Sequence, residues 1–144
     1  MGCLPPMVLT IPSQPRLIRL AHDFVESVCQ AGGLDEKTTH AVVLATGEAV
    51  SNIVRHAHRN RPDALFQIQC RFQQDGIEIC LCDEGEPFDI DAVPHLDPGE
   101  LREGGRGVFL MRTLMDELSC SPRREGGNTL RMRKRCRCRF FEKS

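Results

Sequence analysis

The sequence lacks a long hydrophobic run. No stretch approaches the roughly 18 consecutive apolar residues of a membrane-spanning helix, and Met1–Thr10 has neither the basic start nor the long apolar core of a signal peptide. We therefore predict a cytoplasmic protein with no membrane segment. Its 144 residues, 40% hydrophobic and 27% charged, have the size and composition of one globular domain. We expect residues 1–144 to form that domain, with tails at 1–6 and 140–144.

The sequence also lacks any C-x-x-C pair, although it contains eight cysteines. Its close pairs, Cys80-Leu-Cys82 and Cys136-Arg-Cys138, have the wrong spacing for a zinc site and lie in runs that alternate like strands. Since nothing in the sequence indicates secretion, we interpret the cysteines as reduced thiols and not as a disulfide scaffold. A cysteine-based metal site is disfavoured.

Aromatic residues are few, with seven Phe, no Trp and no Tyr. The formal net charge of −1 conceals a basic C-terminal segment with arginines at alternate positions: Arg131, Arg133, Arg135, Arg137 and Arg139. Because no stacking aromatics are interleaved with these arginines, nucleic-acid binding is disfavoured. The arginines are expected on the exposed face of a final strand, where charge discourages edge pairing. A contact with an acidic partner is the functional alternative.

Hydrophobic periodicity predicts the order of the elements. It indicates a short strand at 7–11, a helix from Ser13 to Gly32, a helix from Asp35 to about His56, strands at 64–73 and 77–83, a long acidic loop at 84–103, a helix at 108–118, and a hairpin of strands at 118–123 and 129–141. Hairpins mixed with helices predict an α+β fold. We expect a two-layer sandwich in which three helices cover one face of a mainly antiparallel sheet of about five strands.

The second predicted helix carries a polar pair that could act in chemistry. Glu48 and Asn52 are one helical turn apart and share a face. A carboxamide oxygen can ligate Mg²⁺, and a carboxylate can deprotonate an attacking hydroxyl. Taken alone, such a pair is more often part of a solvated helix face.

Two further segments offer groups to a ligand. Asp83, at a strand end, could accept a hydrogen bond from an exocyclic amine, and Gly85 beside it lets a flat ring approach the backbone. Gly104-Gly105-Arg106-Gly107, at a helix start, offers N–H groups and the positive end of the helix dipole to an anion. Ordinary turns and helix caps are the simpler interpretation of each segment. The P-loop and protein-kinase motifs are both absent.

In this order, the three segments resemble a known family. Glu48-Ala-Val-Ser-Asn52, Asp83-Glu-Gly85-Glu-Pro87-Phe88 and Glu103-Gly-Gly-Arg-Gly107 are similar to the N box and the two glycine boxes of the GHKL ATPase superfamily. The anti-sigma-factor serine/threonine kinase branch is the most similar, and the resemblance extends from about Val8 to Lys134. It implies a Bergerat fold that binds ATP and Mg²⁺, with a short lid over the nucleotide at 89–103.

The resemblance also implies roles for single residues. Glu48 would be the catalytic general base toward a partner's serine hydroxyl, Asn52 would ligate Mg²⁺, and Asp83 would hold the adenine amine. The other implied nucleotide contacts are Gly85, Phe88, Gly104, Gly105, Arg106, Gly107, Val108 and Thr129. Of these, Thr129 resembles the family's last-strand hydroxyl near the adenine.

The implied function is that of an ATP-dependent serine protein kinase that is also an anti-sigma factor. Such a protein sequesters a sigma factor and phosphorylates an anti-anti-sigma protein of the STAS type, which switches partners. Members of the family commonly form homodimers, so a homodimer is a further expectation. The alternative is an ATP-binding regulatory module that sequesters its partner without kinase activity.

Overall fold

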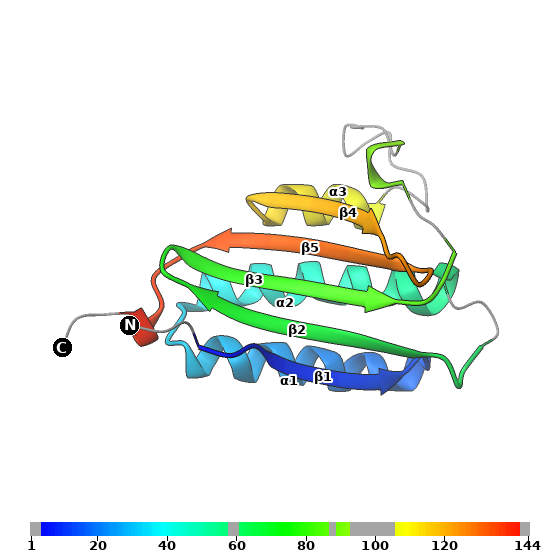
Figure 1. Cartoon of the computed structure of the whole chain (residues 1–144). Coiled ribbons are helices and arrows are strands. Elements are labelled where there is room, and N and C mark those ends of the chain that lie inside the picture. The colour runs from blue at the N-terminus through cyan, green and yellow to red at the C-terminus, as the bar shows by residue number, and fades with distance from the viewer. Residues whose placement is uncertain (1–3, 58–60, 87–88, 93–105, 142–144) are drawn as a thin grey trace.

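The protein is a two-layer α+β sandwich (Figure 1). The computed structural model describes residues 4–57, 61–86, 89–92 and 106–141. Its strands are β1 (Met7–Pro12), β2 (Leu65–Gln73), β3 (Gly76–Asp83), β4 (Glu117–Pro122) and β5 (Asn128–Arg135), and its α-helices are α1 (Ile18–Ala31), α2 (Glu36–Asn52) and α3 (Arg106–Leu114). This arrangement confirms the predicted fold class. Among the described residues, no helix has the length and hydrophobicity that crossing a bilayer requires.

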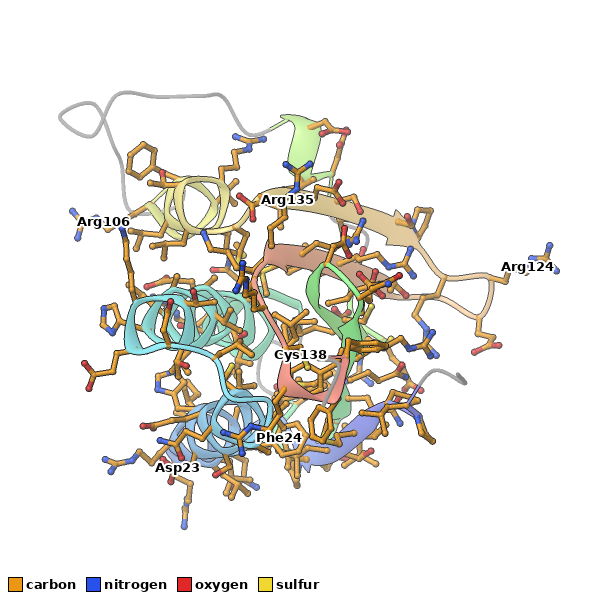
Figure 2. All side chains as sticks on the ribbon, turned by 90° about the vertical axis from the view of Figure 1, so that its left-hand side faces the viewer. Asp23, Phe24, Arg106, Arg124, Arg135 and Cys138 are labelled. Carbon is orange, nitrogen blue, oxygen red and sulfur yellow. The ribbon has the colours of Figure 1, made fainter. Side chains whose placement is uncertain are left out.

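The five strands form one antiparallel sheet in the order β1-β2-β3-β5-β4. All three helices lie on the same face of this sheet (Figure 1): α1 behind β1 and β2, α2 behind the centre, and α3 beside β4. Viewed along the strands, the helices form one layer and the sheet forms the other (Figure 2). The C-terminal end of α2 and the end of β3 therefore lie at the same end of the sandwich.

The core lies between the two layers. The alternation predicted for β2 is present, because Phe66, Ile68, Cys70 and Phe72 are all buried on the helix-facing side. The same face of β3 contributes Ile77, Ile79 and Leu81. Burial of an aliphatic or aromatic side chain of this size stabilises a fold by about 1.5–3 kcal/mol. The sheet can therefore hold the helices, and the residues they carry, in fixed positions.

Local signals set the ends of α1 and α2. At the end of α1, Gly32 packs against Phe72, because a Cβ at that position would collide with the ring, and Gly33, with a φ of +74°, lets the chain turn toward α2. Asp35 caps α2 by accepting a hydrogen bond from the Thr38 N–H at 2.7 Å. Beyond Asn52, the helix continues as a wider π turn over Ile53–Ala57.

Three predicted boundaries are wrong. The first α-helix begins at Ile18 and not at Ser13, and a 3₁₀ turn, Pro15–Leu17, precedes it. The third helix ends at Leu114 and not at 118, because Leu118 belongs to β4, where it pairs with Met132. The last strand ends at Arg135 and not at 141, and a 3₁₀ turn, Arg139–Phe141, follows it. The ends of α3 and β5 are hard to predict from the sequence, because apolar residues that suit a helix or a strand continue past each of them.

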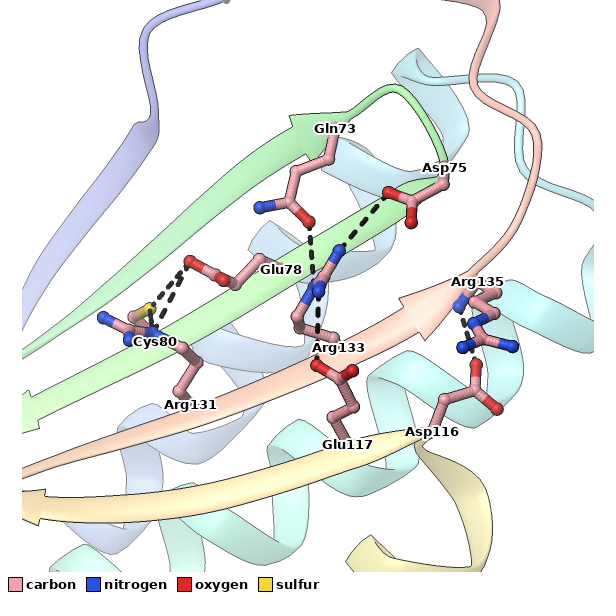
Figure 3. A network of polar contacts seen from close by, with 9 residues as sticks. All are labelled: Gln73, Asp75, Glu78, Cys80, Asp116, Glu117, Arg131, Arg133 and Arg135. Carbon is pink, nitrogen blue, oxygen red and sulfur yellow. Dashed lines mark hydrogen bonds and ion pairs between the residues drawn. The ribbon is translucent and has the colours of Figure 1, made fainter.

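The face of the sheet opposite the helices carries paired charges (Figure 3). Arg133 contacts Asp75 at 3.3 Å and Glu117 at 3.2 Å, and Arg131 lies 3.7 Å from Glu78. These pairs confirm the predicted outward face for Arg131 and Arg133, whereas Arg137 and Arg139 lie beyond the end of β5 and not on the strand. Exposed ion pairs contribute little stability, so their main effect is to neutralise the arginine charge locally.

Candidate functional site

The site is built around the contact between α2 and α3. A Cβ placed on Gly107, the second residue of α3, would lie 3.1 Å from Glu48 Oε2, 3.4 Å from Asn52 Nδ2 and 3.6 Å from Asn52 Oδ1. The structure therefore brings Glu48, Asn52 and Gly107 together, although Asn52 and Gly107 are 55 positions apart in the chain. Glycine allows the α3 backbone to approach both polar side chains.

The first turn of α3, a nine-residue helix, lies at this contact. The N–H groups and positive dipole end of a helix start favour an anion. Arg106 is exposed at the same end (Figure 2), whereas Val108 is 1% exposed and belongs to the core. Val108 therefore holds α3 in place, and a direct contact to a ligand would involve its backbone. Gly104 and Gly105 lie outside the described residues.

Asp83 occupies a buried position at the end of β3 and is 4% exposed. Its Oδ1 accepts hydrogen bonds from the Gly85 N–H at 2.8 Å and from Asn128 Nδ2 at 3.2 Å. Asp83 and Gly85 are thus close together, as predicted. Phe88, the other predicted contact in this segment, lies outside the described residues.

Thr129 is not beside Asp83. In the β3–β5 register, Asp83 pairs with Asn128, and Thr129 pairs with Cys82. Because consecutive strand residues point to opposite faces, the Thr129 side chain is on the outward face, where its Oγ1 lies 3.8 Å from Cys82 Sγ. The residue that faces Asp83 is Asn128, which sequence reasoning missed. The alternation in the sequence could have indicated Asn128, because Thr129 shares its strand face with Arg131 and Arg133, which were predicted to be exposed.

The beginning of the predicted lid is anchored to α3. Ile90 is 3% exposed in the core, and its carbonyl accepts a hydrogen bond from Arg112 Nη2 at 2.8 Å. Most of the predicted lid, including 93–103, lies outside the described residues. Its anchored start connects the end of β3 with the helix that faces Glu48 and Asn52.

Three carboxylates lie near the end of β3 and act on the thiol of Cys120 in β4. Burial first, and then the charges of Asp83, Asp89 and Asp91, raise the pKa of the Cys120 thiol to about 11. A polyphosphate entering this region therefore meets repulsion from the carboxylates, which cations and helix N-termini can offset.

The donor groups at the α2–α3 contact are compatible with a Mg²⁺ ion held mostly by phosphates. Within the described part of the chain, no group of three or more His, Cys, Asp or Glu side chains could hold a metal. Mg²⁺ commonly takes one or two protein ligands together with substrate phosphates and water. The Asn52 carboxamide, beside the α3 N-terminus, fits that arrangement.

Comparison with known proteins agrees with this geometry. The model of the histidine kinase-like ATPase domain matches residues 11–134. The chain is 29% identical over 118 residues to the serine-protein kinase RsbW of Oceanobacillus iheyensis, covering 76% of this chain and 75% of that protein. It is 29% identical over 118 residues to RsbW of Bacillus subtilis, with coverages of 76% and 74%.

Two solved structures show the same fold at low sequence identity. The structure of the RsbU and RsbW domains of Rv1364c from Mycobacterium tuberculosis has a TM-score of 0.67 at 16% identity. That match covers 94% of this chain but only 33% of the larger one. The SiaB–SiaC complex from Pseudomonas aeruginosa gives a TM-score of 0.64 at 16% identity, covering 93% of this chain and 91% of the other.

Proposed function

The chain belongs to the histidine kinase-like ATPase domain family, and from this premise we propose that it is an ATP-dependent serine protein kinase. The observation that carries the proposal is the meeting of Glu48 and Asn52 with Gly107 at the start of α3. This contact brings together a carboxylate, a carboxamide that could ligate a metal ion, and a helix start of the kind that favours an anion. Similarity to proteins named serine-protein kinase supports transfer to a protein hydroxyl.

Phosphoryl transfer depends mainly on positioning and on charge neutralisation. In the proposed mechanism, Glu48 accepts the proton of a partner's serine hydroxyl as that oxygen bonds to the terminal phosphorus of ATP, while the bond from this phosphorus to the bridging oxygen of the β-phosphate breaks and ADP leaves. Asn52 would hold Mg²⁺, which when bound neutralises phosphate charge. The first turn of α3, with Arg106 and Gly107, would orient the phosphates, and Gly104 and Gly105 are proposed to extend that cradle.

Recognition of the base is assigned to the end of β3. Asp83 would accept a hydrogen bond from the adenine amino group through a carboxyl oxygen. Gly85, and by resemblance Phe88, would border the ring. The Thr129 side chain lies on the outward face of the sheet, so the proposal gives it no contact with the base.

We further propose that the protein is an anti-sigma factor that acts by partner switching in the cytoplasm. It would sequester a sigma factor and phosphorylate a STAS-type anti-anti-sigma protein. A phosphate adds nearly two negative charges, which can weaken that protein's binding to the kinase. A homodimer, also expected from the family resemblance, remains part of this proposal.

The test is a pull-down from the native cell with and without Mg-ATP, followed by transfer of radiolabelled phosphate to the recovered proteins. We expect a STAS-type protein to be labelled on serine and a sigma factor to be recovered with the unlabelled complex. Binding of ATP without transfer would favour the alternative, a regulatory module without kinase activity. Failure to bind ATP would contradict the nucleotide site itself.

A further inference from the structure

We propose that Asn128 is a positioning residue that fixes the Asp83 carboxylate in the orientation that reads the amino group of adenine. The inference rests on the proposed function, because it concerns the same nucleotide. It assigns a role to a side chain that the sequence did not indicate, on the strand next to the one that ends at Asp83.

The first observation is that two polar side chains are buried opposite each other. Asp83 and Asn128 are directly paired across β3 and β5, and each is 4% exposed. Asn128 Nδ2 donates to Asp83 Oδ1 at 3.2 Å and to the Glu86 carbonyl at 2.8 Å. A buried polar group is costly unless it is hydrogen-bonded. The carboxamide is therefore held in one orientation, and it holds the carboxylate in turn.

The second observation is that the turn between β4 and β5 presses against the same strand end. Gly127 has a φ of +97°, and a Cβ on it would collide with the Asp83 carbonyl oxygen. Arg123 Nη1 donates to that carbonyl at 3.0 Å. Arg123 and Gly127 thus hold the backbone of Asp83 in place, which keeps its carboxylate at a constant distance from Asn128.

The hydrogen bonds on the carboxylate are distributed unevenly. Within the described part of the chain, both the Gly85 N–H and Asn128 Nδ2 donate to Oδ1. Two fixed donors on one oxygen define the plane of the carboxylate, so its other oxygen has a fixed direction in which to accept a ligand proton. That acceptor favours a 6-aminopurine and disfavours a 6-oxopurine, which presents a carbonyl there.

A threonine or alanine at position 128 could not replace this arrangement. The single Asn128 nitrogen reaches two acceptors, Asp83 Oδ1 and the Glu86 carbonyl. A hydroxyl has one proton to donate, and a methyl group has none. Loss of the carboxamide therefore leaves Asp83 Oδ1 with the hydrogen bond from the Gly85 N–H, about which the carboxylate can rotate, and it removes the Asn128 hydrogen bond to the Glu86 carbonyl.

The experiment compares the Kd of ATP with that of purine riboside triphosphate, which lacks the 6-amino group. Both are measured for the wild type, Asn128→Ala, Asn128→Thr and the control Ser121→Ala, an exposed residue of the same hairpin. We expect the two Asn128 variants to lose about tenfold in ATP affinity and much less in affinity for the analogue. The control should keep the wild-type ratio of the two Kd values.

The ratio separates positioning from a general loss of structure. If a folded Asn128 variant keeps the wild-type ratio of the two Kd values, because it binds both nucleotides as well as the wild type or loses affinity for both equally, the inference is overturned. The proposed function then still stands. If the wild type itself does not bind ATP, the proposed function is overturned, and the inference with it. Thermal unfolding of each variant identifies those that are folded at the assay temperature.

Discussion

Gly107 of α3 lies against the carboxylate of Glu48 of α2, so closely that a Cβ on Gly107 would stand 3.1 Å from Glu48 Oε2. This distance is shorter than an ordinary van der Waals contact, so the carboxylate would have to yield by a few tenths of an ångström. The position of the Glu48 carboxylate therefore depends on the absence of a side chain at one position of a different helix.

The first prediction concerns Gly107→Ala. The added methyl group should displace the Glu48 carboxylate slightly and lower kcat for phosphate transfer by about tenfold, because transfer depends on alignment. The unfolding midpoint should change little, since the displaced atom is the end of a flexible side chain. Steady-state kinetics with Thr113→Ala, an exposed change on the same helix, provide the matched control. An unchanged kcat would contradict the proposed geometry.

The second prediction separates chemistry from binding. Glu48→Gln keeps the size of the side chain but removes the proton acceptor, so transfer should fall by about 10²- to 10⁴-fold. The Kd of Mg-ATP, measured by titration calorimetry, should stay near the wild-type value. Glu26→Gln, on the exposed surface of α1, controls for loss of a charge. Transfer at the wild-type rate by Glu48→Gln would remove Glu48 from the mechanism.

The third prediction compares two neighbouring glycines with positive φ. Gly126 and Gly127 have φ values of +94° and +97°, but a Cβ on Gly126 would contact nothing within 4 Å. Gly126→Ala should therefore cost only the backbone strain, about 1 kcal/mol. Gly127→Ala adds a collision with the Asp83 backbone and should cost more than about 3 kcal/mol in urea unfolding, with weaker ATP binding. Equal losses for both variants would show that the turn does not press on Asp83.

The fourth prediction concerns stability at alkaline pH. Burial is the main cause that raises the pKa of the Cys29 and Cys70 thiols from 9.0 to about 12. Above pH 9 the unfolded chain loses these protons while the folded chain keeps them, so the free energy of unfolding should fall as pH rises toward 12. Each thiol contributes a slope of about 1.4 kcal/mol per pH unit in this window, and below pH 9 the stability is fully present.

Urea unfolding of the wild type and Cys70→Ala at several pH values checks this slope. The variant has a lower stability at neutral pH because it leaves a cavity, but its decline above pH 9 should be shallower by the contribution of one thiol. Parallel declines in the two proteins would contradict the assignment.

Much of this structure is predictable because its strands alternate clearly. The apolar positions of β2, from Phe66 to Phe72, identify both the strand and its buried face. The expected position of Thr129 near the adenine was wrong, because the prediction followed the type of residue and ignored which face of the strand Thr129 occupies. The proximity of Glu48 to Gly107 could not be predicted from sequence spacing, because it depends on how α3 packs beside α2 on the same face of the sheet. Helix and strand ends near Leu118 and Cys136 were ambiguous because apolar residues continue past them.

The turn Arg139–Phe141 closes the described chain at the end of the sandwich away from Asp83 (Figure 1), where the Arg139 N–H donates to the Gly32 carbonyl at 2.8 Å. A fluorescent protein or a second domain joined beyond this turn would leave the end of the sandwich that carries the end of β3 unobstructed. The layout therefore suits the protein to use as a modular unit whose attachments lie opposite the proposed nucleotide site.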